Sequence, residues 1–313
     1  MFYGRASEFQ RLRDEGTTSF AIVGPGRIGK TSLVKEYIRS LHRAKDLRSA
    51  TSTYLDLYEC AHKTAQGVCR AIAMRIESSR RADRLAPDDF VNFLRYQHHR
   101  AGWAPTLILD EVDEVCVNPS IREVWSAAAK QGACRFILAG RGNLLRTVFD
   151  TTSPLSERFE LLRMEPLDEA AAEQLLFDPL ADLGFRFRRR LECRDRIFRL
   201  TGKFPHLVQF YAGRLAGLAI SEGCDEITPE HLDRLQWDFE TAQYFVSPLA
   251  DLTSPRAKVV ALSILKSGWT SVTVGAAQRA AAMAGVPLSH AETLERVKKA
   301  LKQDSGLLFR DAV

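Results

Sequence analysis

Short apolar runs alternate with stretches of helical periodicity through the first half of the chain. Five apolar runs have the length of buried strands, and they span 18–23, 53–57, 106–109, 135–139 and 159–164. Between the first two, apolar residues recur at helical spacing over 32–41. Strands that alternate with helices are typical of a parallel sheet covered by helices. We therefore predict a five-stranded parallel α/β core over residues 1–165.

Helical periodicity dominates after Pro166. The predicted helices span 167–176, 190–200, 205–220 and 229–239. Acidic residues at the start of the first helix complement its dipole. The last has Thr228 as N-cap and Pro229 at its first position. Residues 166–245 are therefore predicted to form an all-α helical lid domain.

A proline-containing linker near 246–254 introduces a third unit. Three short helical patterns follow, over 256–265, 274–284 and 289–302, and an apolar run at 306–309 completes the pattern. Three helices and a terminal strand predict a C-terminal winged-helix domain over 246–313.

A glycine-rich turn joins the first predicted strand to the first predicted helix. Residues 24–31 read Gly-Pro-Gly-Arg-Ile-Gly-Lys-Thr and match GxxxxGK[ST]. Glycines let backbone N–H groups point at phosphate oxygens, and the helix N-terminus adds partial positive charge. We expect Lys30 to reach the β- and γ-phosphates and Thr31 to bind Mg²⁺ through its hydroxyl. The predicted ATP/ADP-binding residues of this loop are Gly24, Pro25, Gly26, Arg27, Ile28, Gly29, Lys30, Thr31 and Ser32, of which Arg27 is expected to face solvent.

The third predicted strand ends in a pair of acids, Asp110 and Glu111. A hard dication prefers oxygen ligands, so Asp110 is expected to hold Mg²⁺ together with Thr31. Glu111 is expected to orient and deprotonate the attacking water. With a P-loop earlier in the chain, this pair predicts a P-loop NTPase of the ASCE type that hydrolyses ATP. We expect the hydrolysis to be slow, as is common in nucleotide switches.

The fourth predicted strand ends in Gly-Arg-Gly, with Arg141 at its centre. A cation at this strand end would lie beside the γ-phosphate, so we assign Arg141 a catalytic sensing role beside Lys30 and Glu111. An exposed loop arginine is the alternative. Arg158 could act as an arginine finger across a subunit interface.

Bulk composition narrows the class of protein further. The chain has 45% hydrophobic and 27% charged residues, and it carries no apolar run long enough for a membrane span and no secretory signal segment. Its six cysteines are scattered without a CxxC pair, which favours reduced thiols over a zinc or disulfide framework. We expect a cytoplasmic protein without a membrane partner.

Positive charge is concentrated at the C-terminal end. Residues 255–313 hold nine Lys/Arg and four Asp/Glu, and nine minus four equals the +5 of the whole chain. Such a segment can meet nucleic acid or an acidic partner, or form a solvated helix face.

Two further motifs resemble those of STAND ATPases, a branch of the AAA+-like P-loop ATPases. Residues 2–9, Phe-Tyr-Gly-Arg-Ala-Ser-Glu-Phe, look like the opening FxGRxxE motif, and Gly-Lys-Phe-Pro at 202–205 looks like the GxP motif. The resemblance to archaeal and bacterial members extends over nearly the whole chain. It implies that Tyr3, Gly4 and Arg5 flank the adenine, that Pro205 contacts the base, and that His206 contacts nucleotide or caps its helix.

The resemblance implies a nucleotide-operated switch in signalling or defence. ADP would hold a closed monomer under the winged helix, and ATP would open it for homo-oligomerisation. Effector or sensor parts would belong to a larger protein or to partner chains. The alternative is a DNA-binding AAA+ ATPase of the origin-binding kind, and its predicted recognition helix carries Arg296, Lys298, Lys299 and Lys302. A nucleotide-binding scaffold with little turnover is a third possibility.

Overall fold

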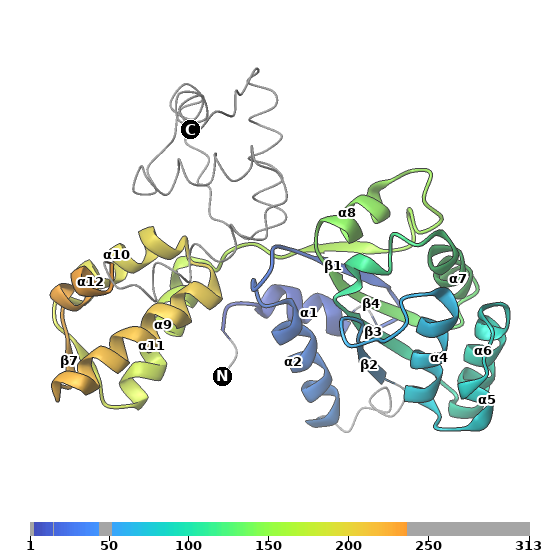
Figure 1. Cartoon of the computed structure of the whole chain (residues 1–313), viewed down its shortest axis with the longest axis horizontal. Coiled ribbons are helices and arrows are strands. Elements are labelled where there is room, and N and C mark those ends of the chain that lie inside the picture. Colours follow the sequence, from blue (N-terminus) through green and yellow to red (C-terminus); the bar gives the residue numbers. More distant parts are fainter. Residues whose placement is uncertain (1–2, 15, 44–51, 237–313) are drawn as a thin grey trace, which may run out of the picture.

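The structure, a computed structural model, describes residues 3–14, 16–43 and 52–236. The predicted winged-helix domain and the end of the predicted lid lie outside these residues. The described part forms a strand-and-helix core, blue to green in Figure 1, and a helical group, yellow-green to orange. The two lie side by side and are joined by the segment that follows the last core strand.

A five-stranded parallel sheet forms the centre of the core, as predicted. Its order is β2-β3-β4-β1-β5, and every neighbouring pair is parallel. The β4 strand separates β1 from β3, which is the order expected of the ASCE type. The strands are β1 (Phe20–Val23), β2 (Ser52–Asp56), β3 (Thr106–Asp110), β4 (Arg135–Gly140) and β5 (Glu160–Arg163).

Helices cover both faces of this sheet (Figure 1). In β4, Phe136 and Leu138 pack on one side while Ile137 and Ala139 pack on the other, because successive strand side chains alternate. One face is covered by α1 (Ala6–Asp14) and α2 (Lys30–Arg43). The other is covered by α4 (Ala65–Ile76), α5 (Arg80–Asp83), α6 (Phe90–Ala101), α7 (Pro119–Lys130) and α8 (Gly142–Phe149), with two short 3₁₀ turns, η1 (Pro87–Asp89) and η2 (Val112–Glu114).

Four helices form the second group, and all four were predicted. They are α9 (Glu169–Asp182), α10 (Arg190–Thr201), α11 (Pro205–Glu222) and α12 (Pro229–Gln236), and they share a hydrophobic core of their own. The α9 helix runs past its predicted end at residue 176 and contains Pro179. A two-stranded parallel pair, β6 (Arg186–Phe187) with β7 (Glu226–Ile227), was not predicted, because two residues are too few to show a period.

Side chains of the N-terminal segment and of the residue before α11 pack between the core and the helical group. Phe204, just before α11, is buried in a hydrophobic cluster of the core. The same cluster contains Ile28 of the P-loop and Met164, which follows β5. Tyr3, at the start of the described chain, packs instead against the helical cluster. The N-terminal segment and the start of α11 are therefore fixed beside the P-loop.

Within the described ranges, no helix combines the length and apolar character needed to cross a membrane. All six cysteines fall in these ranges and are free thiols, four of them buried.

Candidate functional site

The P-loop places Lys30 inside the turn that it closes. Its Nζ donates to the carbonyl oxygens of Gly24 at 3.0 Å and Pro25 at 2.9 Å. The residue is only 4% exposed. Burial lowers the pKa of the Lys30 ammonium, Arg141 lowers it further, and Glu111 partly opposes both. A buried ammonium at the start of a helix is suited to an anionic ligand, whose charge would favour the protonated form of Lys30.

Thr31 and Asp110 meet although 79 residues separate them. The Thr31 hydroxyl donates to Asp110 Oδ2 at 2.6 Å, and the Tyr54 hydroxyl donates to the same oxygen at 3.3 Å. Asp110 is 1% exposed. The Thr31 hydroxyl in the first turn of α2 and the Asp110 carboxylate at the carboxyl end of β3 are hard oxygen donors, so this pair fits Mg²⁺. Burial, followed by the Asp110 charge, raises the pKa of Tyr54.

Tyr54 was not among the predicted site residues. The sequence placed it within a strand, and only the pairing of β2 with β3 brings it beside Asp110. The pattern of apolar residues along β2 does not show which strand lies beside it, so the sequence could not place Tyr54 next to Asp110.

Glu111 and Arg141 form an ion pair over the P-loop. Arg141 Nη2 lies 3.4 Å from Glu111 Oε2. Glu111 adopts a left-handed backbone with φ of 50° and ψ of 48°, which turns it out of the strand. A Cβ added to Gly26 would lie 3.5 Å from the Arg141 guanidinium carbon. The structure thus brings the predicted base, the predicted sensor and the P-loop together.

A cavity of about 270 Å³ joins the P-loop to the helical group. Five segments that are far apart in sequence line it: the N-terminal segment, the P-loop, the turn after β3, the region of α9 and the first turns of α11. The lining residues are Tyr3, Arg5, Arg27, Ile28, Gly29, Lys30, Thr31, Ser32, Glu111, Leu167, Leu175, Pro205, His206 and Gln209. Leu167, Leu175 and Gln209 were not predicted, because nothing distinguishes them from ordinary helix residues.

Gly4 and Arg5 fix the N-terminal segment in this arrangement. Gly4 has a φ of +62°, and a Cβ added there would lie 2.1 Å from the Cβ of Ala171 in α9. The Arg5 guanidinium donates to the carbonyl oxygens of Glu165 at 2.6 Å and Ile28 at 3.2 Å. The Gly-Arg pair therefore connects the P-loop to the segment that leads into α9.

His206 lies in the first turn of α11 and lines the same cavity. Burial, and secondarily the nearby Arg27, lowers the pKa of its imidazole. The neutral form is therefore favoured near pH 7. Arg27 itself is solvent-exposed, as predicted, and contributes to the cavity wall from the P-loop.

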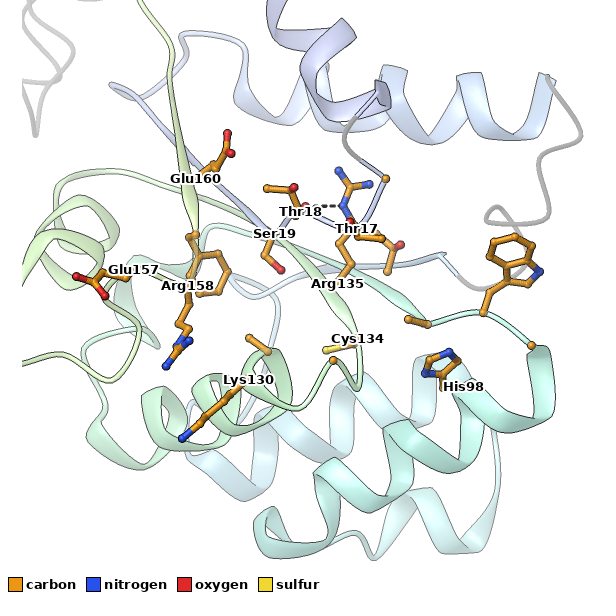
Figure 2. Close-up of a pocket in the computed structure, with 18 residues that line it drawn as sticks. Thr17, Thr18, Ser19, His98, Lys130, Cys134, Arg135, Glu157, Arg158 and Glu160 are labelled. Carbon is orange, nitrogen blue, oxygen red and sulfur yellow. Dashed lines mark hydrogen bonds between the residues drawn. The ribbon is translucent and has the colours of Figure 1, made fainter.

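A second, larger cavity of about 1080 Å³ lies at the opposite ends of the strands. Figure 2 shows Thr18, Ser19, Arg135 and Arg158 around it. Arg158 is exposed just before β5, and Phe20 at the amino end of β1 pairs with Glu160. The P-loop instead follows the carboxyl end of β1. Arg158 therefore points away from the P-loop of its own chain.

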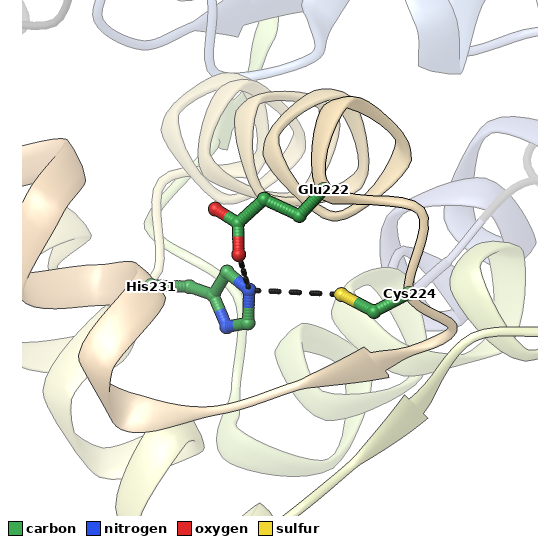
Figure 3. A group of neighbouring side chains, drawn as sticks. All are labelled: Glu222, Cys224 and His231. Carbon is green, nitrogen blue, oxygen red and sulfur yellow. Dashed lines mark hydrogen bonds and ion pairs between the residues drawn. The ribbon is translucent and has the colours of Figure 1, made fainter.

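Glu222, Cys224 and His231 gather in the helical group (Figure 3). His231 Nε2 lies 3.3 Å from a Glu222 oxygen and 3.9 Å from the Cys224 sulfur. His231 Nδ1, however, accepts the Thr228 backbone N–H at 2.9 Å. A neutral ring with this acceptor carries its proton on Nε2, so that nitrogen has no lone pair for a metal. The group is a capping hydrogen-bond cluster.

Comparisons with known proteins agree with this geometry. Residues 13–148 match the family described as an AAA domain. The fold matches the ORC1 protein of Aeropyrum pernix in complex with DNA, with a TM-score of 0.56 and 18% identity over 96% of this chain and 82% of that one. It also matches the Aeropyrum pernix ORC2 protein in its ADPNP-ADP complexes, with a TM-score of 0.62 and 13% identity over 95% and 85%. A mutant form of the Thermotoga maritima RuvB protein matches with a TM-score of 0.51 and 16% identity over 95% and 87%.

No curated protein matches the sequence. The sheet and the matches show a five-stranded parallel α/β P-loop NTPase fold, within which residues 13–148 match an AAA domain. This class is broader than the STAND branch that the opening motif and the GxP motif resemble. At such low identities the solved structures establish the fold alone.

Proposed function

We propose that this chain is a Mg²⁺-dependent ATPase in which the bound nucleotide controls how the helical group sits over the P-loop core. One observation carries the proposal: the cavity beside Lys30 is walled by both the core and α11. A nucleotide in such a cavity contacts both the core and the helical group. ATP and ADP, which differ by one phosphate, can therefore stabilise different arrangements of the two parts. Residues 1–165, 166–245 and a winged-helix domain at 246–313 would be the moving parts.

Each residue of the site has a role in this proposal. Lys30 and the P-loop amides would hold the phosphates, and Thr31 with Asp110 would hold Mg²⁺, which neutralises charge on the phosphates when bound. Glu111 would accept a proton from the attacking water. Tyr3, Pro205 and His206 would face the base and ribose. Arg141, which is paired with Glu111, would sense the γ-phosphate.

The output of this ATPase has two candidates. A switch that oligomerises in signalling or defence follows from the STAND resemblance. DNA binding is better supported by the matched structures, because the Aeropyrum pernix ORC1 protein and a Drosophila ORC were solved with DNA. The +5 charge of residues 255–313 also suits a phosphate backbone. We therefore favour a nucleotide-regulated DNA-binding ATPase over a signalling switch.

The nucleotide switch is tested by light scattering and small-angle X-ray scattering with ADP and with a slowly hydrolysed ATP analogue. We expect a different shape or mass in the two states. Identical curves, with both nucleotides shown to be bound, would rule out nucleotide control.

The DNA-binding function is tested by duplex binding over a salt series. Phosphate contacts give a steep linear loss of log affinity with log salt, and each lost contact flattens the slope by about 0.9. Replacing Lys298 and Lys299 by Ala should flatten it, whereas Arg186→Ala and Arg189→Ala should not, because those arginines pair with Asp225 and Glu230. If the affinity of the wild type for duplex DNA did not depend on salt, DNA binding would be excluded and the signalling switch would remain.

A further inference from the structure

Asp113 caps a helix to which it is not adjacent in sequence. It lies in η2, two residues after Glu111, and its Oδ1 accepts the backbone N–H groups of Asn143 at 2.9 Å and Leu144 at 3.3 Å. Its Oδ2 accepts the backbone N–H of Arg141. A carboxylate that accepts the free N–H groups of a helix start also complements the helix dipole.

This contact replaces the cap that α8 lacks locally. The N-cap residue of α8 is Arg141, which makes no side-chain cap hydrogen bond. The Asn143 side chain adds a return contact, since its Nδ2 donates to the Asp113 carbonyl at 3.2 Å. Gly140 allows the approach, because a Cβ there would lie 2.8 Å from Asp113 Oδ2.

The consequence concerns the pair formed by Glu111 and Arg141. Both residues are close to Asp113. Glu111 precedes Asp113 by two residues, and the Arg141 backbone N–H donates to the Asp113 carboxylate. The side chains of the pair then meet 3.4 Å apart above Gly26. One carboxylate therefore sets the relative position of the two groups that flank the γ-phosphate position in the proposed ATPase.

We propose that Asp113 is a positioning residue, which acts on ATP turnover by holding Arg141 against Glu111 and the P-loop. The inference rests on the proposed ATPase function and adds one residue to it. Both carboxylate oxygens of Asp113 accept backbone N–H groups at the start of α8, so its effect on turnover passes through the position of Arg141.

A double-mutant cycle on the full chain tests this role. Asp113→Ala and Arg141→Ala should each lower kcat by roughly 10- to 100-fold, the range expected when a catalytic group is misplaced by about 1 Å. ADP affinity should change less than about threefold, because the P-loop contacts remain. The double variant should be no slower than Arg141→Ala, since two residues that act as one unit are not additive.

A purely structural role gives a different result. If Asp113 only stabilises α8, Asp113→Ala lowers the melting temperature and keeps kcat, or its effect on kcat multiplies with that of Arg141→Ala in the double variant, and either outcome overturns the proposal. Asn118→Ala is the matched control, because Asn118 caps α7 by accepting the Ser120 N–H at 3.1 Å, away from the site. It should lower the melting temperature and leave kcat unchanged.

Two further results separate the possible failures. If Asp113→Ala does not fold, Asp113→Asn keeps one acceptor oxygen without the charge and is expected to show the same coupling to Arg141→Ala. A wild type that hydrolyses ATP while Asp113 variants keep full kcat overturns the positioning role alone. A wild type that binds no nucleotide overturns the proposed function as well.

Discussion

Lys30 shows how a single buried charge ties stability to ligand binding. Its lowered pKa means that, between that value and the ordinary 10.5 of lysine, the unfolded chain binds more protons than the folded one. Stability therefore rises with pH across this window. Bound phosphates favour the ammonium and reverse the shift, so nucleotide binding in the window should be accompanied by proton uptake.

Replacing this lysine should uncouple stability from nucleotide. We expect ADP at about 100 times its Kd to stabilise the wild type by about 2.7 kcal/mol, and to leave the melting temperature of Lys30→Ala unchanged. Differential scanning fluorimetry with and without ADP and Mg²⁺ measures the difference. Lys35→Ala is the control: it removes an equal charge from an exposed position of the same helix and should keep the full shift. If ADP raised the melting temperature of Lys30→Ala as much as that of the wild type, Lys30 would have no part in nucleotide binding.

The cysteines should react in two groups. Burial raises the pKa of Cys69 and of Cys116 to about 12, raises that of Cys193 to about 11 and raises that of Cys134 as well. Thiolate is the reactive form, so these four should resist alkylation in the folded chain at about pH 8. Timed iodoacetamide labelling and peptide mass spectrometry should find Cys60 and Cys224, which are part-exposed, modified first. Rapid labelling of Cys134 would contradict the described packing.

Among the elements, β4 depends on one buried guanidinium. Arg135 is 3% exposed. Its three nitrogens donate to the carbonyl oxygens of Thr18 at 2.7 Å and Leu12 at 2.9 Å and to the Tyr37 hydroxyl at 2.7 Å. These partners belong to the β1 entry, α1 and α2, so one side chain joins β4 to three other segments.

Removing Arg135 should therefore be costly. Arg135→Ala leaves three buried acceptors without their donor, and we expect a loss of about 3 kcal/mol in the free energy of unfolding. Tyr37→Phe removes one of these contacts and should cost about 1 kcal/mol. Urea unfolding followed by circular dichroism compares the two. A similar loss in both variants would show that the two carbonyl contacts contribute little.

The elements that the sequence predicts have either an apolar pattern that extends over several residues or a strong local motif. Five strands and four helices of the second group follow from apolar runs and caps such as Thr228 before Pro229. The α1 helix was missed because its apolar face is short and consists of Phe9 and Leu12. The β6–β7 pair joins residues about 40 positions apart through two residues each, so no local signal exists.

Site residues follow the same division. The P-loop and the Asp110-Glu111 pair carry their chemistry in consecutive residues, and the structure joins them through Thr31 and Asp110. Tyr54 and Asp113 act through partners on other strands and loops, which a single sequence does not reveal. The opening motif and the GxP segment were recognisable only by resemblance, and the cavity that they share with the P-loop is a property of the folded chain.

For the whole molecule, the opposite placement of Arg158 and Lys30 has a consequence for assembly. The two residues lie at opposite ends of the sheet, so a contact between Arg158 and nucleotide requires a second copy of the chain. The cavity around Arg158 in Figure 2 carries both basic and acidic side chains at its edge, with Lys130 near Arg158 and with Glu157 and Glu160 on the same wall. The sequence named Arg158 as a candidate, but only the fold excludes action within one chain.

Mixing two inactive variants tests this arrangement. Arg158→Ala keeps its P-loop but lacks the arginine, whereas Lys30→Ala lacks nucleotide but keeps the arginine. If Arg158 acts across an interface, an equimolar mixture should hydrolyse ATP faster than the sum of the separate variants, because Lys30→Ala supplies the arginine to its neighbour. An arginine finger contributes about 10³-fold or more, so even partial rescue is measurable. Mixing Arg158→Ala with the Lys30→Ala/Arg158→Ala double variant is the control and should give no gain. Equal rates in both mixtures would show that Arg158 takes no part in turnover.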